Sequence, residues 1–277
     1  MGLRINTNIA SLSAQRNLQK ATNGLHRNFE HLSTGRRIAR ASDDAAGLAI
    51  ATRLNAQIRS LSQAARNAND GISLVQAAEG ALDELGGVLT RARELSVQSA
   101  NGTLSPTDQD ALNAEFSSLI RQVDQIANST DFNGIPLLNS AGNVISLQVG
   151  AGTVANTDTL DVTLTSVLAA DLSIDSLDIG STGDATAAID ALDLAIDVIS
   201  SERSSLGAVQ NTLTGTISAI EIRSENLSAA RSRILDVDVA SETAELTKNN
   251  ILQQAALSVL AQANQQPQAV LSLLQGR

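Results

Sequence analysis

The chain has 277 residues, of which 43% are apolar, and it contains no Cys, Trp or Tyr and only three Phe. This length fits one large domain or two modest ones. Without Cys, the chain has no disulfide framework, thiolate metal site or thiol nucleophile. Its net charge of −10 argues against a preference of the whole protein for nucleic acid or anionic membrane.

Charge is unevenly distributed along the chain. Residues 1–66 hold ten Lys or Arg against three Asp or Glu, a net charge of +7. No basic residue lies between Arg121 and Arg203, whereas Asp recurs throughout that stretch. A basic end and an acidic middle are suited to attract each other between copies of the chain.

Helical periodicity begins near the N-terminus. Apolar residues have the spacing of one helix face at Ile5, Ile9 and Leu12, and again at Leu25, Phe29 and Leu32. Gly35 is suited to end this helix, and Ser42, Asp43 and Asp44 to start a second one that reaches about residue 100. The second helix carries a seven-residue repeat typical of a coiled-coil seam, weakest at the small Ala68 and made by Leu54, Ile58, Leu61, Ile72, Val75, Leu82 and Leu89.

The middle of the chain changes from helix to strand. Ser105 and Pro106 predict the start of another helix, because Ser can cap it and Pro is tolerated at its first position. This helix is expected to reach about residue 127, and residues 130–134 have the composition of a turn. Two runs of alternating apolar residues then predict a small β-hairpin near residues 140–165. The runs are Ile145, Leu147, Val149 and Leu160, Val162, Leu164.

Helical periodicity returns at about residue 186. A second seven-residue seam is predicted from Leu192, Ile199, Leu206, Leu213, Ile220, Leu227 and Ile234. Beyond it, the apolar helical pattern continues through Ile251, Leu252 and Val259 to Leu271 and Leu274. Neither terminal arm has enough apolar surface to offset its own ordering entropy, so each needs a partner helix. That partner is the opposite terminus, a neighbouring copy, or both.

No motif for catalysis or metal binding is recognisable. His26 and His31 are five residues apart, about 140° around a helix, and lack the i, i+4 spacing of a metalloprotease helix. Gly150 and Gly152 lack the Lys that follows a phosphate-binding loop. The basic N-terminal arm has no interleaved aromatic residues for base stacking. We therefore expect no catalytic, cofactor or metal site, no nucleic-acid partner and no membrane span.

Several segments resemble the bacterial flagellins. The N-terminal signature of that family is similar to LSTGRRIARASDDAAGLAIATRL at 32–54, and LTRARELSVQSANGT at 89–103 follows in family order. The C-terminal signature is similar to NLSAARSRILDVDVASE at 226–242 and ILQQAALSVLAQANQQPQAVLSLL at 251–274. The resemblance spans about residues 1–150 and 190–277, which is most of the chain.

The resemblance implies a mainly α fold, in which the N- and C-terminal halves form a long antiparallel coiled-coil rod with a small β-hairpin region in its middle. Residues 1–42 and 236–277 would form an inner helical coiled coil, and residues 43–235 an outer rod without additional domains. The chain would be exported unfolded and self-assemble into the extracellular filament used for motility. Its partners would be copies of itself, an export chaperone, and the filament cap and junction proteins.

Two alternatives to a filament subunit remain open from the sequence. One is the hook–filament junction protein, which resembles flagellin only at its ends; the fuller match at residues 89–103 favours flagellin. The other is a coiled-coil signalling or nucleic-acid-binding protein.

The resemblance also implies a partner outside the bacterium. In flagellins sensed by the vertebrate Toll-like receptor for flagellin, an Arg, a Leu and a Glu form the main contact, and they match Arg91, Leu95 and Glu115 here. Arg91 and Leu95 are spaced i, i+4, which predicts a shared helix face. The same three residues are equally suited to pack one protofilament against another.

Overall fold

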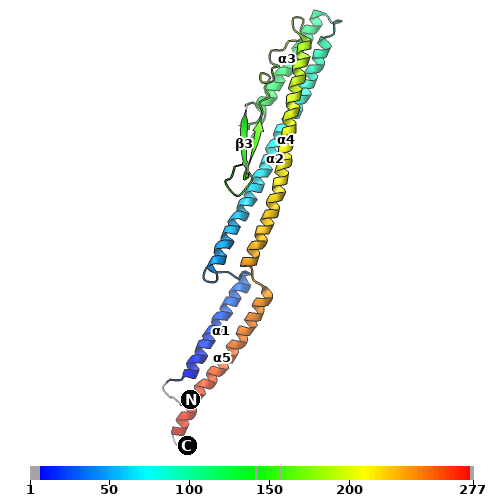
Figure 1. Ribbon diagram of the computed structural model, residues 1–277. Helices are drawn as coiled ribbons and strands as arrows, with labels where there is room; N and C mark the ends of the chain where they lie inside the picture. The colour runs from blue at the N-terminus through cyan, green and yellow to red at the C-terminus, as the bar shows by residue number, and fades with distance from the viewer. Residues whose placement is uncertain (1–6, 141, 156, 275–277) are drawn as a thin grey trace. The chain divides into compact units, whose positions relative to one another are not determined.

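The computed structural model describes residues 7–140, 142–155 and 157–274, with side chains as far as residue 265. The chain divides into two compact units, one made of residues 1–56 and 226–277 and the other of residues 57–225. Long helices dominate, and the strands form two small antiparallel pairs (Figure 1). The predicted fold class, mainly α with a small β-hairpin, is confirmed.

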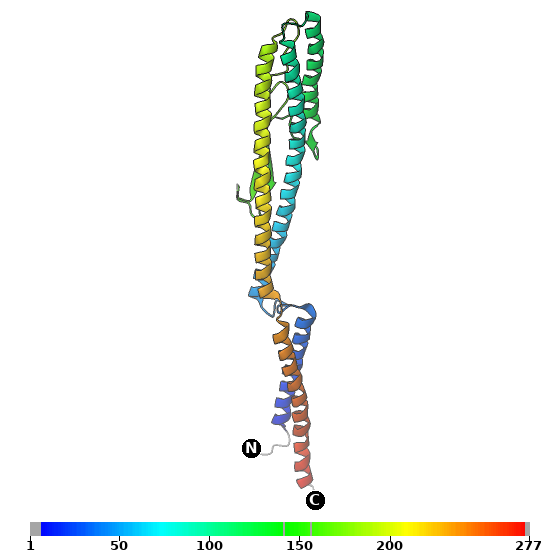
Figure 2. The same cartoon turned by 90° about the vertical axis from the view of Figure 1, so that its right-hand side faces the viewer.

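The first unit is built around α1 (Ile9–Thr34) and α5 (Val239–Leu274), which lie side by side in both views (Figures 1 and 2). Asn8 caps the start of α1 by accepting a hydrogen bond from the Ser11 backbone N–H. Gly35 ends α1 in the left-handed conformation, with φ of 68°, as its position in the sequence predicts. Both ends of α1 are therefore set by local cap chemistry.

Three further helices are α2 (Ala45–Ser99), α3 (Pro106–Ser129) and α4 (Ala185–Leu235). The Asp44 carboxylate accepts a hydrogen bond from the Gly47 N–H at 2.8 Å at the start of α2. Ser105 and Asp108 form a reciprocal capping box at the start of α3, with Pro106 at the first turn. The start at Ser105 is as the sequence predicts, whereas the predicted cap at Ser42 with Asp43 and Asp44 in the first turn is displaced, because Asp44 itself precedes the helix and accepts the Gly47 N–H. The boundary between the two units falls inside α2 and α4.

The strands follow α3. The short pair β1 (Asp131–Phe132) and β2 (Ile135–Pro136) is joined by Asn133 and Gly134, both with positive φ, where the sequence analysis expected only a turn. The second pair is β3 (Asn143–Gln148) and β4 (Thr159–Leu164), in which Ile145 is opposite Val162. This is the predicted hairpin, with its apolar residues on one face.

The apolar core of the second unit lies where α2, α3, α4 and the hairpin meet. Most predicted seam residues are buried, and those that belong to this core are Val75, Leu82, Leu89, Leu192, Ile199, Leu206 and Leu213. Leu61 and Ile220 are buried as well. The remaining ones are half-buried: Leu54, Ile58, Ile72, Leu227 and Ile234. Ala68 is also buried, and Val149 of the hairpin packs beside it and Leu213. The hairpin thus supplies the apolar volume that the small Ala68 does not provide.

Residues 165–184, for which the sequence pattern predicts no helix or strand, form an irregular strap. Its apolar side chains Val167, Leu172, Ile174 and Ile179 are buried in the core of the second unit. Side chains of α3 accept hydrogen bonds from the backbone of the strap. Asp124 accepts from the Ala169 N–H at 2.8 Å, Asn113 from the Ile179 N–H at 3.1 Å, and Asp110 from the Ser181 N–H at 2.9 Å. The Ser181 backbone N–H, followed by its hydroxyl, lowers the pKa of Asp110.

The burial of Leu213 leads to a stability prediction. Leu213 is 0% exposed, so Leu213→Asp would place an unpaired carboxylate in the core, at a cost of about 3–5 kcal/mol. We expect a large drop in melting temperature by circular dichroism. Asn211→Asp adds the same charge at an exposed position of the same helix and should leave the melting temperature nearly unchanged. Equal melting temperatures for the two variants would show that Leu213 is not part of the core.

Candidate assembly and receptor-contact surfaces

The surface between α1 and α5 is made of small and polar residues. The buried residues of α1 are Ser11, Ala14, Ala21, Gly24, Leu25 and Asn28. A Cβ atom at Gly24 would lie 2.8 Å from Nδ2 of Asn249, so the missing side chain lets the two helices approach closely. Only one large apolar side chain, Leu25, is among these buried residues. The fully buried residues that α1 contributes are therefore mostly small or polar.

Hydrogen bonds follow the pair along its length. Near the start of α1, Asn8 Nδ2 donates to the Ala263 carbonyl at 2.7 Å and Ser11 Oγ donates to Asn264 Oδ1 at 2.8 Å. Midway, Gln253 Nε2 lies 3.4 Å from Thr22 Oγ1. These contacts fix α5 antiparallel to α1.

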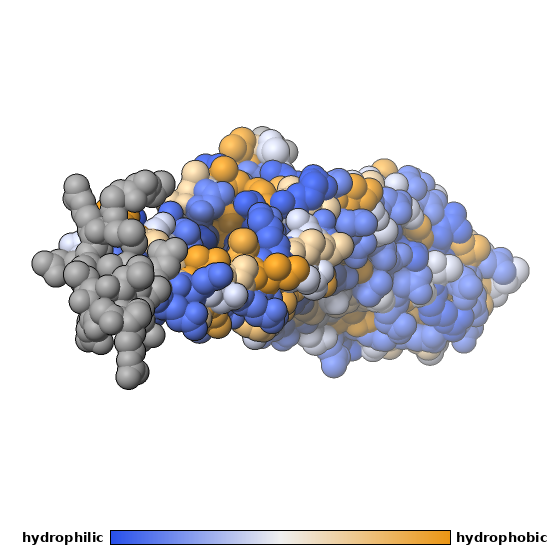
Figure 3. Space-filling view, turned by 90° about the horizontal axis from the view of Figure 1, so that it is seen from below, coloured by the Kyte–Doolittle hydropathy of each residue, from blue (hydrophilic) through white to orange (hydrophobic). Residues whose placement is uncertain are grey.

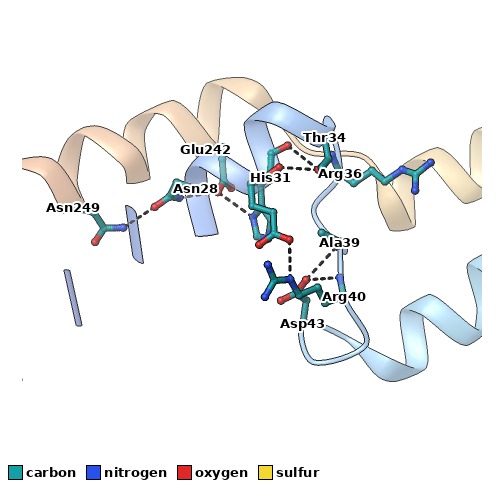
Figure 4. Close-up of polar contacts among 10 residues, drawn as sticks. Asn28, His31, Thr34, Arg36, Ala39, Arg40, Asp43, Glu242 and Asn249 are labelled. Atoms are coloured by element: carbon teal, nitrogen blue, oxygen red, sulfur yellow. Dashed lines mark hydrogen bonds and ion pairs between the residues drawn. The ribbon is translucent and has the colours of Figure 1, made fainter. Parts of the chain in front are cut away.

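A polar cluster closes the other end of the pair (Figure 4). Asn249 Nδ2 donates to Asn28 Oδ1 at 2.8 Å, and Asn28 Nδ2 donates to Glu242 Oε1 at 2.7 Å. The same Oε1 lies 3.1 Å from Nδ1 of His31. His31 thus contacts Glu242, and within the described residues no group of three metal-ligating side chains is present.

Many large apolar residues of both helices lie on the outside of the pair. The exposed fraction is 62% for Ile9 and 61% for Ile251. Other exposed apolar residues of the two helices are Leu12, Phe29, Leu252, Leu257 and Val259. Seen from the end at which the termini lie, orange apolar residues interrupt the polar surface (Figure 3). The predicted arm residues Ile9, Leu12, Ile251, Leu252 and Val259 are therefore left uncovered by the described part of the chain. Ile5 and the side chains of Leu271 and Leu274 lie outside the described residues.

A groove of about 400 Å³ runs along the outside of the α1–α5 pair. Ala14, Ala21, Leu252, Ala255 and Val259 supply its apolar lining. Helices pack by inserting side-chain ridges into grooves. The exposed apolar side chains and the adjacent Ala-lined groove are therefore suited to pack against a helix of another molecule.

Backbone hydrogen bonds tie the two segments that enter and leave the pair. Arg37 N donates to the Leu235 carbonyl at 2.7 Å, and Val237 N donates to the Gly35 carbonyl at 3.1 Å. Ile38, the residue that follows Arg37, is buried. The carboxylate of Asp43 accepts the N–H groups of Arg40 and Ala39, and the bond from Arg40 is the main cause that lowers the pKa of Asp43.

Of the three predicted receptor-contact residues, Arg91 and Glu115 lie together at the surface and Leu95 does not. Arg91 Nη2 donates to Glu115 Oε1 at 2.9 Å, and Arg91 Nη1 donates to Glu94 Oε2 at 3.1 Å. The bond to Glu115 is the main cause that raises the pKa of Arg91. Leu95, by contrast, is 1% exposed and belongs to the core. The i, i+4 spacing predicts a face shared with Arg91, but Leu95 belongs to the same buried cluster as Phe116 of α3 and Leu192 of α4.

Comparison with known proteins identifies the family of this chain. The profile of the bacterial flagellin N-terminal helical region matches residues 5–143, and that of the bacterial flagellin C-terminal helical region matches residues 189–274. A flagellin from Halalkalibacterium halodurans is 49% identical over 270 residues, which cover 98% of this chain and 99% of that protein. The chain belongs to the bacterial flagellin family.

Other flagellins support the same assignment. A flagellin from Bacillus subtilis is 44% identical across 98% of this chain and 100% of its own length. The crystal structure of a Bacillus cereus flagellin is 31% identical, with a TM-score of 0.50, and the match covers 60% of this chain and 94% of that one.

As a flagellin, this protein is a structural subunit of the flagellar filament. The likeness to flagellins along nearly the whole chain favours this function over that of the junction protein. No described helix of the flagellin combines the length and the apolar character that crossing a membrane requires.

Proposed function

We propose that this flagellin polymerises through the outer surface of the α1–α5 pair, defined by Ile9, Leu12, Ile251, Leu252 and Val259. The observation that carries the proposal is the exposure of these large apolar side chains while small and polar residues fill the contact between the two helices. Fully burying a side chain of this size stabilises by roughly 1.5–3 kcal/mol. A neighbouring subunit that covers several of them can therefore offset the ordering of both arms.

The proposal extends to how the subunit reaches its place. A chain without Cys and with three Phe as its only aromatic residues can be threaded unfolded through a narrow export channel, with no disulfide to break. We propose export to an extracellular filament, with an export chaperone that shields the apolar arms beforehand. The filament cap and the junction protein are the further proposed partners.

Removal of either arm tests this proposal. Deleting residues 1–30 or residues 250–277 should leave a soluble, largely helical monomer that does not polymerise, because residues 57–225 keep their own core. The measurement is circular dichroism of the purified chains, followed by electron microscopy after addition of filament seeds. Filaments of normal appearance from both truncated chains would contradict a role of these arms in assembly.

A second proposed function is recognition of the free monomer by the vertebrate Toll-like receptor for flagellin. It rests on the exposed ion-pair cluster of Arg91, Glu94 and Glu115, which joins the faces of α2 and α3. An exposed Arg held in place by two carboxylates presents a fixed donor to a partner, and Arg is favoured at the centre of protein interfaces. Leu95 would act from beneath by supporting Arg91 in this arrangement. Protofilament packing is the competing role for the same cluster.

Alanine substitutions test the receptor contact. Arg91→Ala with Glu115→Ala should weaken binding of the monomer to the receptor ectodomain by at least about tenfold, or roughly 1.4 kcal/mol. Glu84→Ala with Arg121→Ala removes one exposed charge from each of the same two helices and should leave binding near the parent value. Surface plasmon resonance measures both. A parent monomer that does not bind, or equal binding by both double variants, would contradict the proposed contact.

A further inference from the structure

The polar cluster of Asn28, His31, Glu242 and Asn249 makes some alignments of α1 against α5 more stable than others. Small residues fill most of the contact, among them Ala14, Ala21 and Gly24 on α1. On α5, Ala256 is half-buried and Ala263 is buried. A surface of small side chains is nearly the same after one helix slides along the other. Packing alone therefore does little to select a single alignment.

The polar residues do distinguish between alignments. Asn28 is 7% exposed and makes two hydrogen bonds, one to Glu242 and one from Asn249. Glu242 in turn lies within hydrogen-bond distance of His31. A buried polar group that loses its partner is destabilising, because it has given up its contacts with water. Only an alignment that places Glu242 and Asn249 on either side of Asn28 satisfies all of these groups (Figure 4).

A slip of one heptad illustrates the selection. At a rise of 1.5 Å per residue, seven residues displace one helix by about 10.5 Å along the other. Glu242 and Asn249 are themselves one heptad apart on either side of Asn28, so this slip leaves Asn28 beside only one of them and removes its hydrogen bond with the other. Single buried Asn residues are known to fix the register of coiled coils in this way, at some expense in stability.

We infer that Asn28, His31, Glu242 and Asn249 form a register key, which sets the alignment of α1 against α5 and so positions the outer apolar surface for assembly. The inference rests on the proposed assembly function for its consequence but not for its geometry. Ile9 and Leu12 lie on one helix, and Ile251, Leu252 and Val259 on the other. In a slipped pair, the outer apolar residues of α1 and those of α5 would be displaced relative to each other along the helix axes. A neighbouring subunit could then cover only those of one helix at a time.

The absence of Cys allows the register to be measured by disulfide trapping. Thr22 and Gln253 face each other in the observed register, so Thr22→Cys with Gln253→Cys reports that alignment. Leu260 lies one heptad beyond Gln253 on the same side of α5, so Thr22→Cys with Leu260→Cys reports the slipped alignment. Full-length chains are oxidised with oxidised glutathione before and after seeded polymerisation. Mass spectrometry then quantifies the disulfide formed within each chain.

The double variant Asn28→Leu with Asn249→Leu removes the register key. The matched control, Asn23→Leu with Asn250→Leu, makes the same changes at exposed positions of the same two helices. The parent and the control should form the Thr22–Gln253 disulfide almost exclusively. Without the key, the ratio of slipped to observed product should rise at least about tenfold, equivalent to about 1.4 kcal/mol. An unchanged ratio in the keyless variant, both products in the parent, or neither product in any chain would each overturn the inference. A parent that forms only the observed disulfide but no filaments would instead contradict the assembly proposal alone.

Discussion

The most buried part of the contact between α1 and α5 is made of small and polar residues and Leu25, while large apolar residues such as Ile9 and Ile251 lie outside, and the coupling of stability to assembly depends on this arrangement. An isolated two-helix unit is most stable when its largest apolar side chains face each other. Here Ile9 and Ile251 remain uncovered, whereas Asn28 and Ser11 are buried. The second unit follows the ordinary rule, with Leu82, Leu89 and Leu206 fully buried. The two units therefore differ in what they need: one is complete within the chain, and the other lacks a covering surface.

This difference relates stability to assembly. The core of residues 57–225 combines helices, a hairpin and a strap, and Leu213 and Val149 extend it to the point where the hairpin packs on the helices. Such a unit can persist in a free subunit. The α1–α5 pair is held by hydrogen bonds, each of which contributes only about 0.5–1.5 kcal/mol net because water offers competing partners. Covering its apolar surface with another subunit is then the step that makes the arms stable, which couples folding of the arms to growth of a filament.

Much of this fold could be predicted from local chemistry. Gly35 and the Ser105–Pro106 pair mark helix ends through the backbone groups that they satisfy, and the seven-residue repeat identifies Leu206 and Leu213 as core residues. The strap at 165–184 escaped prediction because Ile174 and Ile179 are buried by irregular turns that have no periodic pattern. Periodicity also shows that a helix has an apolar face without showing what covers it. For that reason Leu95 was expected at the surface, and the arm residues could not be assigned to the opposite terminus or to a neighbouring copy.

Solvent access to the arms in monomer and filament tests the central claim most directly. In this Cys-free chain, Ile9→Cys and Ile251→Cys each introduce a single thiol at an exposed position. Its alkylation rate can be compared with that of the same chain unfolded in denaturant. We expect near-unfolded alkylation rates in the monomer and rates at least about tenfold lower in the filament, since neighbouring subunits cover the surface. Thiols at both positions that react equally fast before and after polymerisation would contradict it.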